Sequence, residues 1–236
     1  MSVSWSGGKD SMLALDQIIR SGDYKIDHLH TVIDEDLRRV GMHGIKEKLI
    51  DEQAASLGIP LEKLYLKASD GHHNYEKLMS TYYADLENED FEGVVFGDIF
   101  LEDLRVYREK MLEAAGLQGF YPLWRQNTSQ LIAEFIELGY QTKVCAADAR
   151  FFDAKALGKV VDQKFIDRLP GGVDPCGENG EFHTFVYDGP LFHYPIEVES
   201  QEVTEKSYTY KKTNDDGSQE TLERKFLFAE LSLRRS

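Results

Sequence analysis

A glycine-rich hexapeptide near the start of the chain, Ser6-Gly7-Gly8-Lys9-Asp10-Ser11, has the residues of a phosphate-binding turn. It lies between a short apolar segment, residues 3–5, and a helix pattern over residues 11–20. Adjacent glycines allow unusual backbone conformations and the close approach of a ligand, and the N-terminus of the following helix favours negative charge. The lysine adds a full positive charge and the two serines add hydroxyl donors. The hexapeptide therefore predicts an anion site; the plainer alternative is a strand–helix turn with a helix cap.

A second group of polar residues closes a strand pattern at residues 93–98. Gly97 and Asp98 end this apolar run, and Glu102 follows in the next helix pattern. Because Mg²⁺ prefers oxygen ligands and bridges phosphates, Asp98 and Asp10 are candidate magnesium ligands, with Gly97 beside them. The alternative is a helix N-terminus whose acidic side chains complement the helix dipole.

A third group lies in the glycine-rich segment 171–184, which we expect to form an irregular loop. Glu178, Glu181 and His183 in this segment can position an ammonium ion, bind a metal or move protons. The alternative is a tight turn with solvated acids. Cys176 has only His183 as a nearby base, so we interpret it as a packed or ligand-facing thiol without a covalent role.

The first half of the chain alternates strand and helix patterns, which is typical of a parallel sheet covered by helices on both faces. The predicted helices lie near residues 11–20, 43–57, 74–87 and 104–115, and the predicted strands near residues 3–5, 26–33, 61–66, 93–98 and 120–124. Ligands of such sheets bind at the carboxyl ends of the strands, so the hexapeptide and Asp98 are expected to share one cleft. His43, which opens the second predicted helix, either stacks on or hydrogen bonds to a nucleotide, or simply begins a helix.

The pattern changes near Trp124. Asn127 begins a further helix pattern, a strand pattern starts at Gln141, and the residues after 190 are mostly β, with a hairpin signal at Asn214–Gly217. We therefore predict an α/β domain over residues 1–124 and a second, α+β domain with a β-rich C-terminus over residues 125–236.

The composition excludes several classes of function. The 236 residues carry a net charge of −15, and such an acidic chain repels a nucleic-acid backbone, which argues against broad nucleic-acid binding. No apolar run approaches the roughly 18 residues of a membrane helix, so no membrane association is expected. Two distant cysteines and no secretion signal predict a reduced, cytoplasmic protein without a zinc or iron–sulfur site.

The hexapeptide is not a Walker A loop, in which four residues separate the glycines and Gly-Lys-Ser/Thr follows. It resembles instead the PP-loop of the ATP pyrophosphatases, also called adenine nucleotide alpha hydrolases. The resemblance implies that this loop grips the β- and γ-phosphates of ATP while the α-phosphate is attacked and pyrophosphate is released.

Further motifs extend the resemblance to the diphthine–ammonia ligase family of PP-loop enzymes. In order along residues 1–192, the matching segments are Ser6–Ser11, Met42-His43-Gly44, Gln53-Ala54, residues 57–61, Gly97–Ile99 with Glu102-Asp103, residues 121–124, Gly177–Thr184 and Asp188-Gly189-Pro190. The resemblance implies a HUP-type, Rossmann-like nucleotide domain, a second domain particular to the family, and a cleft between them. It also implies an enzyme that adenylates a carboxylate with ATP so that ammonia can displace AMP and leave an amide.

The resemblance assigns roles to the candidate residues. ATP would be bound by Ser6, Gly7, Gly8, Lys9, Asp10, Ser11, His43 and Gly97. The catalytic residues would be Lys9, Asp98, Glu178, Glu181 and His183, with Mg²⁺ on Asp10 and Asp98. The partners would be ATP, ammonium and a carboxylate on a small molecule or a protein; a homodimer is left open.

One departure bears on the acceptor. Family members that make diphthamide, by amidating diphthine on elongation factor 2, tend to have Glu-Gly-Gly-Glu-Tyr/Phe-Glu-Ser/Thr in the late loop. Here Asn179 replaces a glycine and His183 replaces an acid. The variant resembles a bacterial branch for which amidation in cobalamin salvage is the alternative to diphthine. A sulfur-transfer enzyme would require a cysteine pair, whereas a non-enzymatic ATP or AMP sensor would bind nucleotide without turnover.

Overall fold

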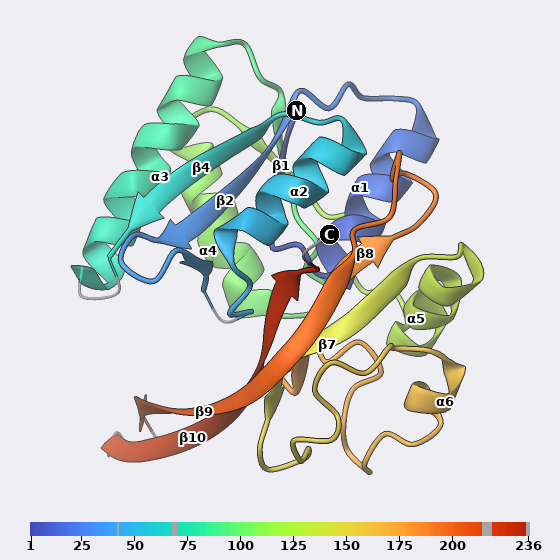
Figure 1. Ribbon diagram of the computed structural model, residues 1–236. Coiled ribbons are helices and arrows are strands. Elements are labelled where there is room, and N and C mark those ends of the chain that lie inside the picture. Colours follow the sequence, from blue (N-terminus) through green and yellow to red (C-terminus); the bar gives the residue numbers. More distant parts are fainter. Residues whose placement is uncertain (42, 68–69, 214–218, 235–236) are drawn as a thin grey trace.

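The first half of the molecule is built on a parallel sheet. The computed structural model describes residues 1–236 except residues 42, 68–69, 214–218 and 235–236 (Figure 1). The parallel strands pair in the order β4-β2-β1-β5-β6; their bounds are β1 (Ser2–Ser4), β2 (His28–Asp34), β4 (Leu61–Leu66), β5 (Gly93–Val95) and β6 (Gln118–Phe120). A short strand, β3 (Arg39–Val40), pairs antiparallel with the end of β2. This order is that of a Rossmann-like sheet.

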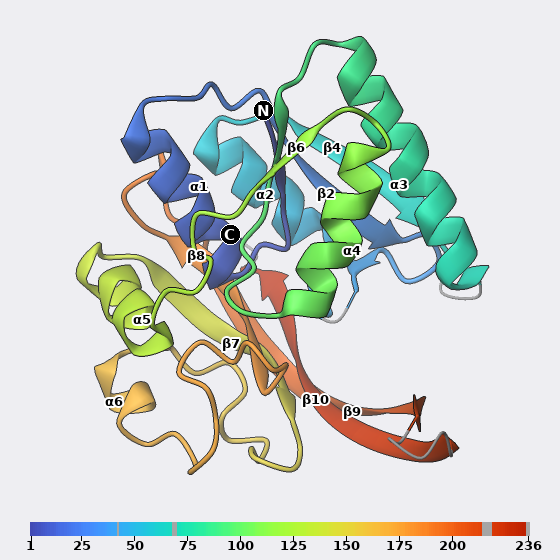
Figure 2. The same cartoon turned by 180° about the vertical axis from the view of Figure 1, so that it is seen from behind.

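Two pairs of helices cover the two faces of this sheet. Helices α1 (Lys9–Ser21) and α2 (Glu47–Leu57) lie on one face, and α3 (Gly71–Asn88) and α4 (Glu102–Glu113) lie on the other (Figures 1 and 2). Strand β5 is buried on both sides, because helices cover both faces of the sheet. Successive side chains of a strand point to opposite faces. Val95 belongs to the core under α1 and α2, whereas Val94 packs under α3 and α4.

The second half is built on an antiparallel sheet, in the order β8-β7-β10-β9. Its strands are β7 (Gln141–Asp148), β8 (Phe182–Asp188), β9 (Val198–Thr213) and β10 (Gln219–Leu233), and its helices are α5 (Thr128–Glu137) and α6 (Gln163–Ile166). The Asn127 side chain caps α5 by accepting a hydrogen bond from the N–H of Gln130 at 3.1 Å. One hydrophobic core continues from α1 into this half, where it includes Phe135 and Phe185.

Strands β9 and β10 extend beyond the body of the molecule as a two-stranded arm (Figures 1 and 2). Only Phe226–Phe228 of β10 also pair with β7. The hairpin signal at Asn214–Gly217 lies outside the described residues, as does Met42. The described residues contain no helix that is both long and apolar enough to span a membrane.

The predicted fold class is confirmed, because a Rossmann-like parallel sheet is followed by a second, α+β unit. The predicted bounds at residues 124 and 125 remain a prediction. Helix α2 begins at Glu47, not at His43, because the Val40 N–H bonds to the carbonyl of Ile45 at 2.9 Å and closes a turn. Segment 171–184 is a loop only up to residue 181, since β8 begins at Phe182.

Candidate active site

The phosphate loop, Ser6–Ser11, and the Gly97-Asp98 turn meet at one edge of the parallel sheet. The loop follows β1 and the turn follows β5, and these two strands are neighbours. The strand order reverses direction between them, which is where ligands bind in sheets of this kind. Gly97 lies so close to the start of α1 that a Cβ atom on it would be 2.7 Å from the carbonyl carbon of Asp10. Glycine is therefore required there to bring the two segments together.

A cavity of about 790 Å³ opens at this edge and is lined from both halves of the chain. Among the predicted residues, its lining includes Ser6, Asp10, Ser11, His43, Gly97, Asp98, Glu178 and His183. The other predicted residues lie behind this surface and are buried: Gly7, Gly8, Lys9 and Glu181. The volume is in the range of roughly 300–1,000 Å³ that is typical of small-molecule sites.

The phosphate loop is held from behind by strand β8 and helix α2. The carbonyl of Gly7, whose φ is +78°, accepts hydrogen bonds from the N–H of Val186 and from Nε2 of Gln53, both at 3.0 Å. The N–H of Lys9 donates to Oγ1 of Thr184 at 3.0 Å. The loop conformation therefore depends on residues far away in sequence. Thr184 and Gln53 lie in the matching motifs, but no sequence signal marked them as supports of the loop.

Lys9 is a buried cation beneath the loop. Its side chain is 4% exposed, and its Nζ lies 2.8 Å from Oδ2 of Asp10 and 5.3 Å from the centre of the Phe182 ring. Burial alone would lower the pKa of Lys9, but the acidic groups around it, Asp10 foremost, together outweigh burial and the pKa is raised. The ammonium is thus charged and already ordered before any ligand binds.

Asp98 presents a carboxylate oxygen that lacks a hydrogen-bond partner in the described part of the chain. This Oδ2 is buried, and Nε of Arg108 lies 3.3 Å from it. Burial raises the pKa of Asp98; the Arg108 guanidinium lowers it in part, and the charge of Asp10 raises it further. Arg108 was missed in the sequence because it lies inside an ordinary helix pattern.

The carboxylates of Asp98 and Asp10 suit Mg²⁺, which is commonly bound by one or two carboxylates together with phosphates and water. No group of three or more His, Cys, Asp or Glu side chains that could hold a metal occurs within the described ranges. A magnesium ion here would therefore take its remaining ligands from the substrate phosphates and from water.

Two imidazole rings pack against each other at a tilt in the wall of the cavity. The ring centres of His43 and His183 are 4.5 Å apart, with 45° between the planes. Burial lowers the pKa of both side chains, that of His183 to about 4, and the Lys9 charge acts in the same direction. Both rings are therefore neutral near pH 7. Nε2 of His183 is buried and has no hydrogen-bond partner among the described residues.

The two glutamates of the late segment have different positions. Oε1 of Glu178 accepts hydrogen bonds from the N–H groups of Ile99 at 2.8 Å and Phe100 at 3.3 Å, and its carboxylate lines the cavity. Burial raises the pKa of Glu178 to about 7. Glu181 is buried, and its Oε1 accepts hydrogen bonds from the N–H of Asp174 at 3.2 Å and from Nδ2 of Asn179 at 3.0 Å. Glu178 is thus the glutamate at the cavity, while Glu181 holds the loop.

Cys176 is a packed thiol in this structure. It is 3% exposed, and its Sγ donates to the carbonyl of Thr128 at 3.3 Å. Burial raises the pKa of Cys176 far above its usual range, so the thiolate that nucleophilic chemistry requires is disfavoured.

The remaining wall of the cavity is mainly apolar and aromatic, and sequence reasoning missed it. It is formed by side chains of α3 and α4, by Phe96 directly after β5, and by Phe226 of β10; the helix residues include Tyr75, Met79, Tyr83 and Met111. Phe226 is buried, and it also faces this cavity. These residues occur at ordinary core spacing, which does not distinguish a cavity wall from a filled core.

Comparison with known proteins follows the same division of the chain. Residues 1–119 match the family model described as diphthamide synthase N-terminal domain, and residues 127–222 match the diphthamide synthase C-terminal domain. A human protein named diphthine–ammonia ligase is 30% identical over 220 residues, covering 84% of this chain and 82% of the relative. The bovine protein of that name is 31% identical over 224 residues, covering 86% of this chain and 84% of the relative.

Proposed function

Because this chain belongs to the diphthine–ammonia ligase family, we propose that it is an ATP-dependent ligase that joins ammonia to a carboxylate and releases AMP and pyrophosphate. The observation that carries the proposal is the single cavity that brings the phosphate loop, Asp98, Glu178 and His183 together. These groups supply what the two half-reactions need: a site for phosphates, charge stabilisation, and a group that can take up a proton.

In the first half-reaction, an oxygen of the acceptor carboxylate attacks the α-phosphorus of ATP, and the bond to the β-phosphate breaks. Ser6 and Ser11, with the glycines and backbone of the loop, hold the phosphates. Lys9 stabilises the negative charge that develops on pyrophosphate, because an ordered cation in a buried site requires no reorganisation when the charge appears. Mg²⁺ on Asp98 and Asp10 would neutralise phosphate charge in the same step.

In the second half-reaction, ammonia attacks the acyl carbon and the bond to AMP breaks. The nitrogen loses one proton on the way to the amide. Glu178 accepts that proton, since a base with a pKa of about 7 is well matched to neutral pH. His183 orients ammonia or the acceptor through its neutral ring.

The identity of the acceptor depends on the late segment. An acid at the position of His183 accompanies diphthine in the members that make diphthamide, whereas His183 is neutral here. We therefore expect His183→Glu to change the choice of acceptor more than it changes ATP binding. Relative rates on diphthine-bearing elongation factor 2 and on a corrinoid carboxylate, measured beside the ATP affinity, check this. An equal loss of both would mean that His183 has only a structural role.

The proposal is tested by product analysis. Purified protein is incubated with ATP, Mg²⁺ and ammonium, with and without a pool of carboxylate metabolites and protein acceptors. AMP and pyrophosphate that increase with the pool are the expected result. ADP and phosphate would contradict attack at the α-phosphate, and bound ATP without product for any acceptor would favour a nucleotide sensor.

A further inference from the structure

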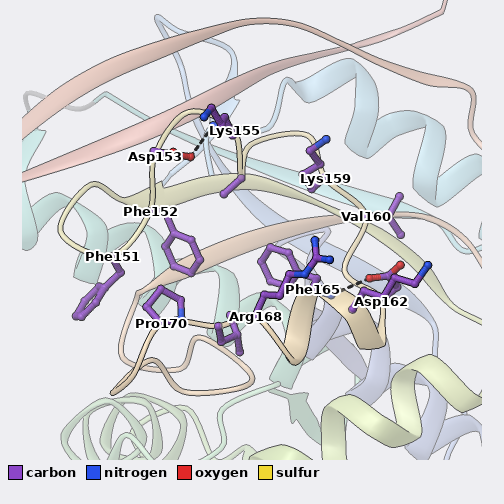
Figure 3. Close-up of a pocket in the computed structure, with 13 residues that line it drawn as sticks. Phe151, Phe152, Asp153, Lys155, Lys159, Val160, Asp162, Phe165, Arg168 and Pro170 are labelled. Carbon is purple, nitrogen blue, oxygen red and sulfur yellow. Dashed lines mark hydrogen bonds between the residues drawn. The ribbon is translucent and has the colours of Figure 1, made fainter.

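A second cavity, of about 750 Å³, lies in the α+β unit and is formed by residues 151–170 (Figure 3). No residue proposed above for the ligase reaction lines it. Its walls include the rings of Phe152 and Phe165, whose planes are almost parallel, at 5°, with centres 6.3 Å apart. Ala156, Val160 and Leu169 extend the apolar lining. A volume of this size with a mostly apolar lining is typical of small-molecule sites.

The rim of this cavity is positively charged, although the chain as a whole has a net charge of −15. Four exposed cations line it: Lys155, Lys159, Lys164 and Arg168. None of the four has an ion pair or a side-chain hydrogen bond within the part of the chain that the structure describes. Figure 3 shows Lys155, Lys159 and Arg168 around the two phenylalanine rings.

The two acids at the rim are already engaged in local backbone hydrogen bonds. Oδ1 of Asp153 accepts from the N–H of Lys155 at 2.9 Å, and Oδ1 of Asp162 accepts from the N–H of Phe165 at 2.8 Å (Figure 3). The second bond caps the short helix α6. These carboxylates hold the turns that shape the cavity. The four cations outnumber the two carboxylates, so the rim keeps an excess of positive charge.

One aromatic ring lies between this cavity and the cavity of about 790 Å³ at the candidate active site, which we call the nucleotide cavity. Phe182 contacts Phe152 and Phe165 edge to face, with ring centres 5.9 and 5.6 Å apart. The same Phe182 lines the nucleotide cavity and lies beneath the Lys9 ammonium. The two cavities are therefore neighbours, with Phe182 between them.

We propose that the second cavity binds a small organic anion, with a flat apolar body packed on Phe152 and Phe165 and a carboxylate, sulfonate or phosphate held by the rim cations. The apolar floor supplies affinity for the body by removing it from water, and the rim selects an anion over a neutral molecule. Both features are needed, because exposed cations alone bind small anions weakly in salt.

The test uses 8-anilinonaphthalene-1-sulfonate, a flat aromatic anion whose fluorescence increases in apolar sites. Saturating ATP keeps the probe out of the nucleotide cavity. We expect saturable binding of one probe per chain, with methyl NMR shifts at Ala156, Val160 and Leu169. Unchanged signals for these methyl groups would overturn the proposal, whether or not ATP displaces the probe.

Charge reversal at the rim tests the role of the cations. Lys159→Glu combined with Arg168→Glu should weaken probe binding at least tenfold, because the rim then repels the sulfonate. Both side chains are exposed, so the variant should keep its fold. The matched control is Lys77→Glu with Lys110→Glu, two exposed lysines on α3 and α4 that do not line the cavity. The control should bind like the parent protein. N-phenyl-1-naphthylamine, which has the same aromatic body without the sulfonate, should bind at least tenfold more weakly; equal binding would refute selection for an anion.

Discussion

Replacing Lys9 by methionine should separate the catalytic role of this lysine from its structural role. The change keeps most of the apolar stem and removes the charge. Breaking a fully buried ion pair costs about 3–5 kcal/mol, whereas exposed pairs contribute at most about 1 kcal/mol. The partner, Asp10, is 31% exposed and can regain water, so we expect a loss of about 2 kcal/mol, between these limits. For a chain of this size that lowers Tm by about 4–8 °C.

The free-energy cost in turnover is expected to exceed the cost in stability. Removal of one preorganised group that stabilises developing charge costs about 2.7–4 kcal/mol in the transition state, or roughly 10²–10³-fold in rate. The assay is formation of AMP and pyrophosphate at a temperature well below both Tm values, so that each protein stays folded.

The matched control for this variant is Lys63→Met. Nζ of Lys63 lies 2.9 Å from both Glu47 and Asp51, away from the cavity. This variant should lose comparable stability and keep its turnover. A folded Lys9→Met protein with the parent rate would refute the role of the buried ammonium, as would equal losses of rate in the two variants.

Three further changes test other parts of the site. Glu178→Gln should abolish the rise in rate as the pH increases through about 7, the value to which burial raises this pKa. Between pH 4.5 and 7 the folded protein holds a proton on Glu178 that the unfolded chain has lost. The parent protein therefore loses stability as the pH rises through this window. Denaturant unfolding at several pH values should show a smaller loss of stability in the variant. Asp98→Asn should raise the Mg²⁺ concentration for half-maximal rate at least about tenfold; an unchanged magnesium titration would remove Asp98 from the metal site. Thr184→Val should cost about 1–3 kcal/mol, because the buried N–H of Lys9 loses its acceptor; urea unfolding measures the loss, and an unchanged stability would contradict the support that Thr184 gives to the loop.

The sequence was sufficient to predict the sheet, because its information is local. Strand and helix patterns alternate along the first half, and the order of the motifs placed the phosphate loop and Asp98 at strand ends that the fold makes adjacent. The second helix was predicted to start at His43 but starts at Glu47, and this difference has a physical reason. The turn that closes after β3 depends on hydrogen bonds between backbone groups, and these leave no periodic signal in the side chains.

The parts of the site that could not be predicted depend on contacts between distant residues. The apolar wall at Tyr75 and Phe96 has the spacing of an ordinary core, and only the assembled structure reveals that the space beside it is open. The same applies to the choice between Glu178 and Glu181. The two side chains are close in sequence, but the backbone of residues 99–100 holds Glu178 toward the cavity, while Asp174 and Asn179 hold Glu181 within the loop.

The hydrogen bonds that Gly7 and Lys9 make to strand β8 limit how this protein can be recombined with its relatives. A chimaera that joins residues 1–124 to the C-terminal half of another family member would inherit a foreign strand behind its phosphate loop. These contacts would be preserved only by a relative that has a hydroxyl side chain at the position of Thr184 and a residue other than proline at the position of Val186. Exchanging acceptor specificity between family members therefore calls for grafting the residues around His183 one by one, with the rest of β8 left in place.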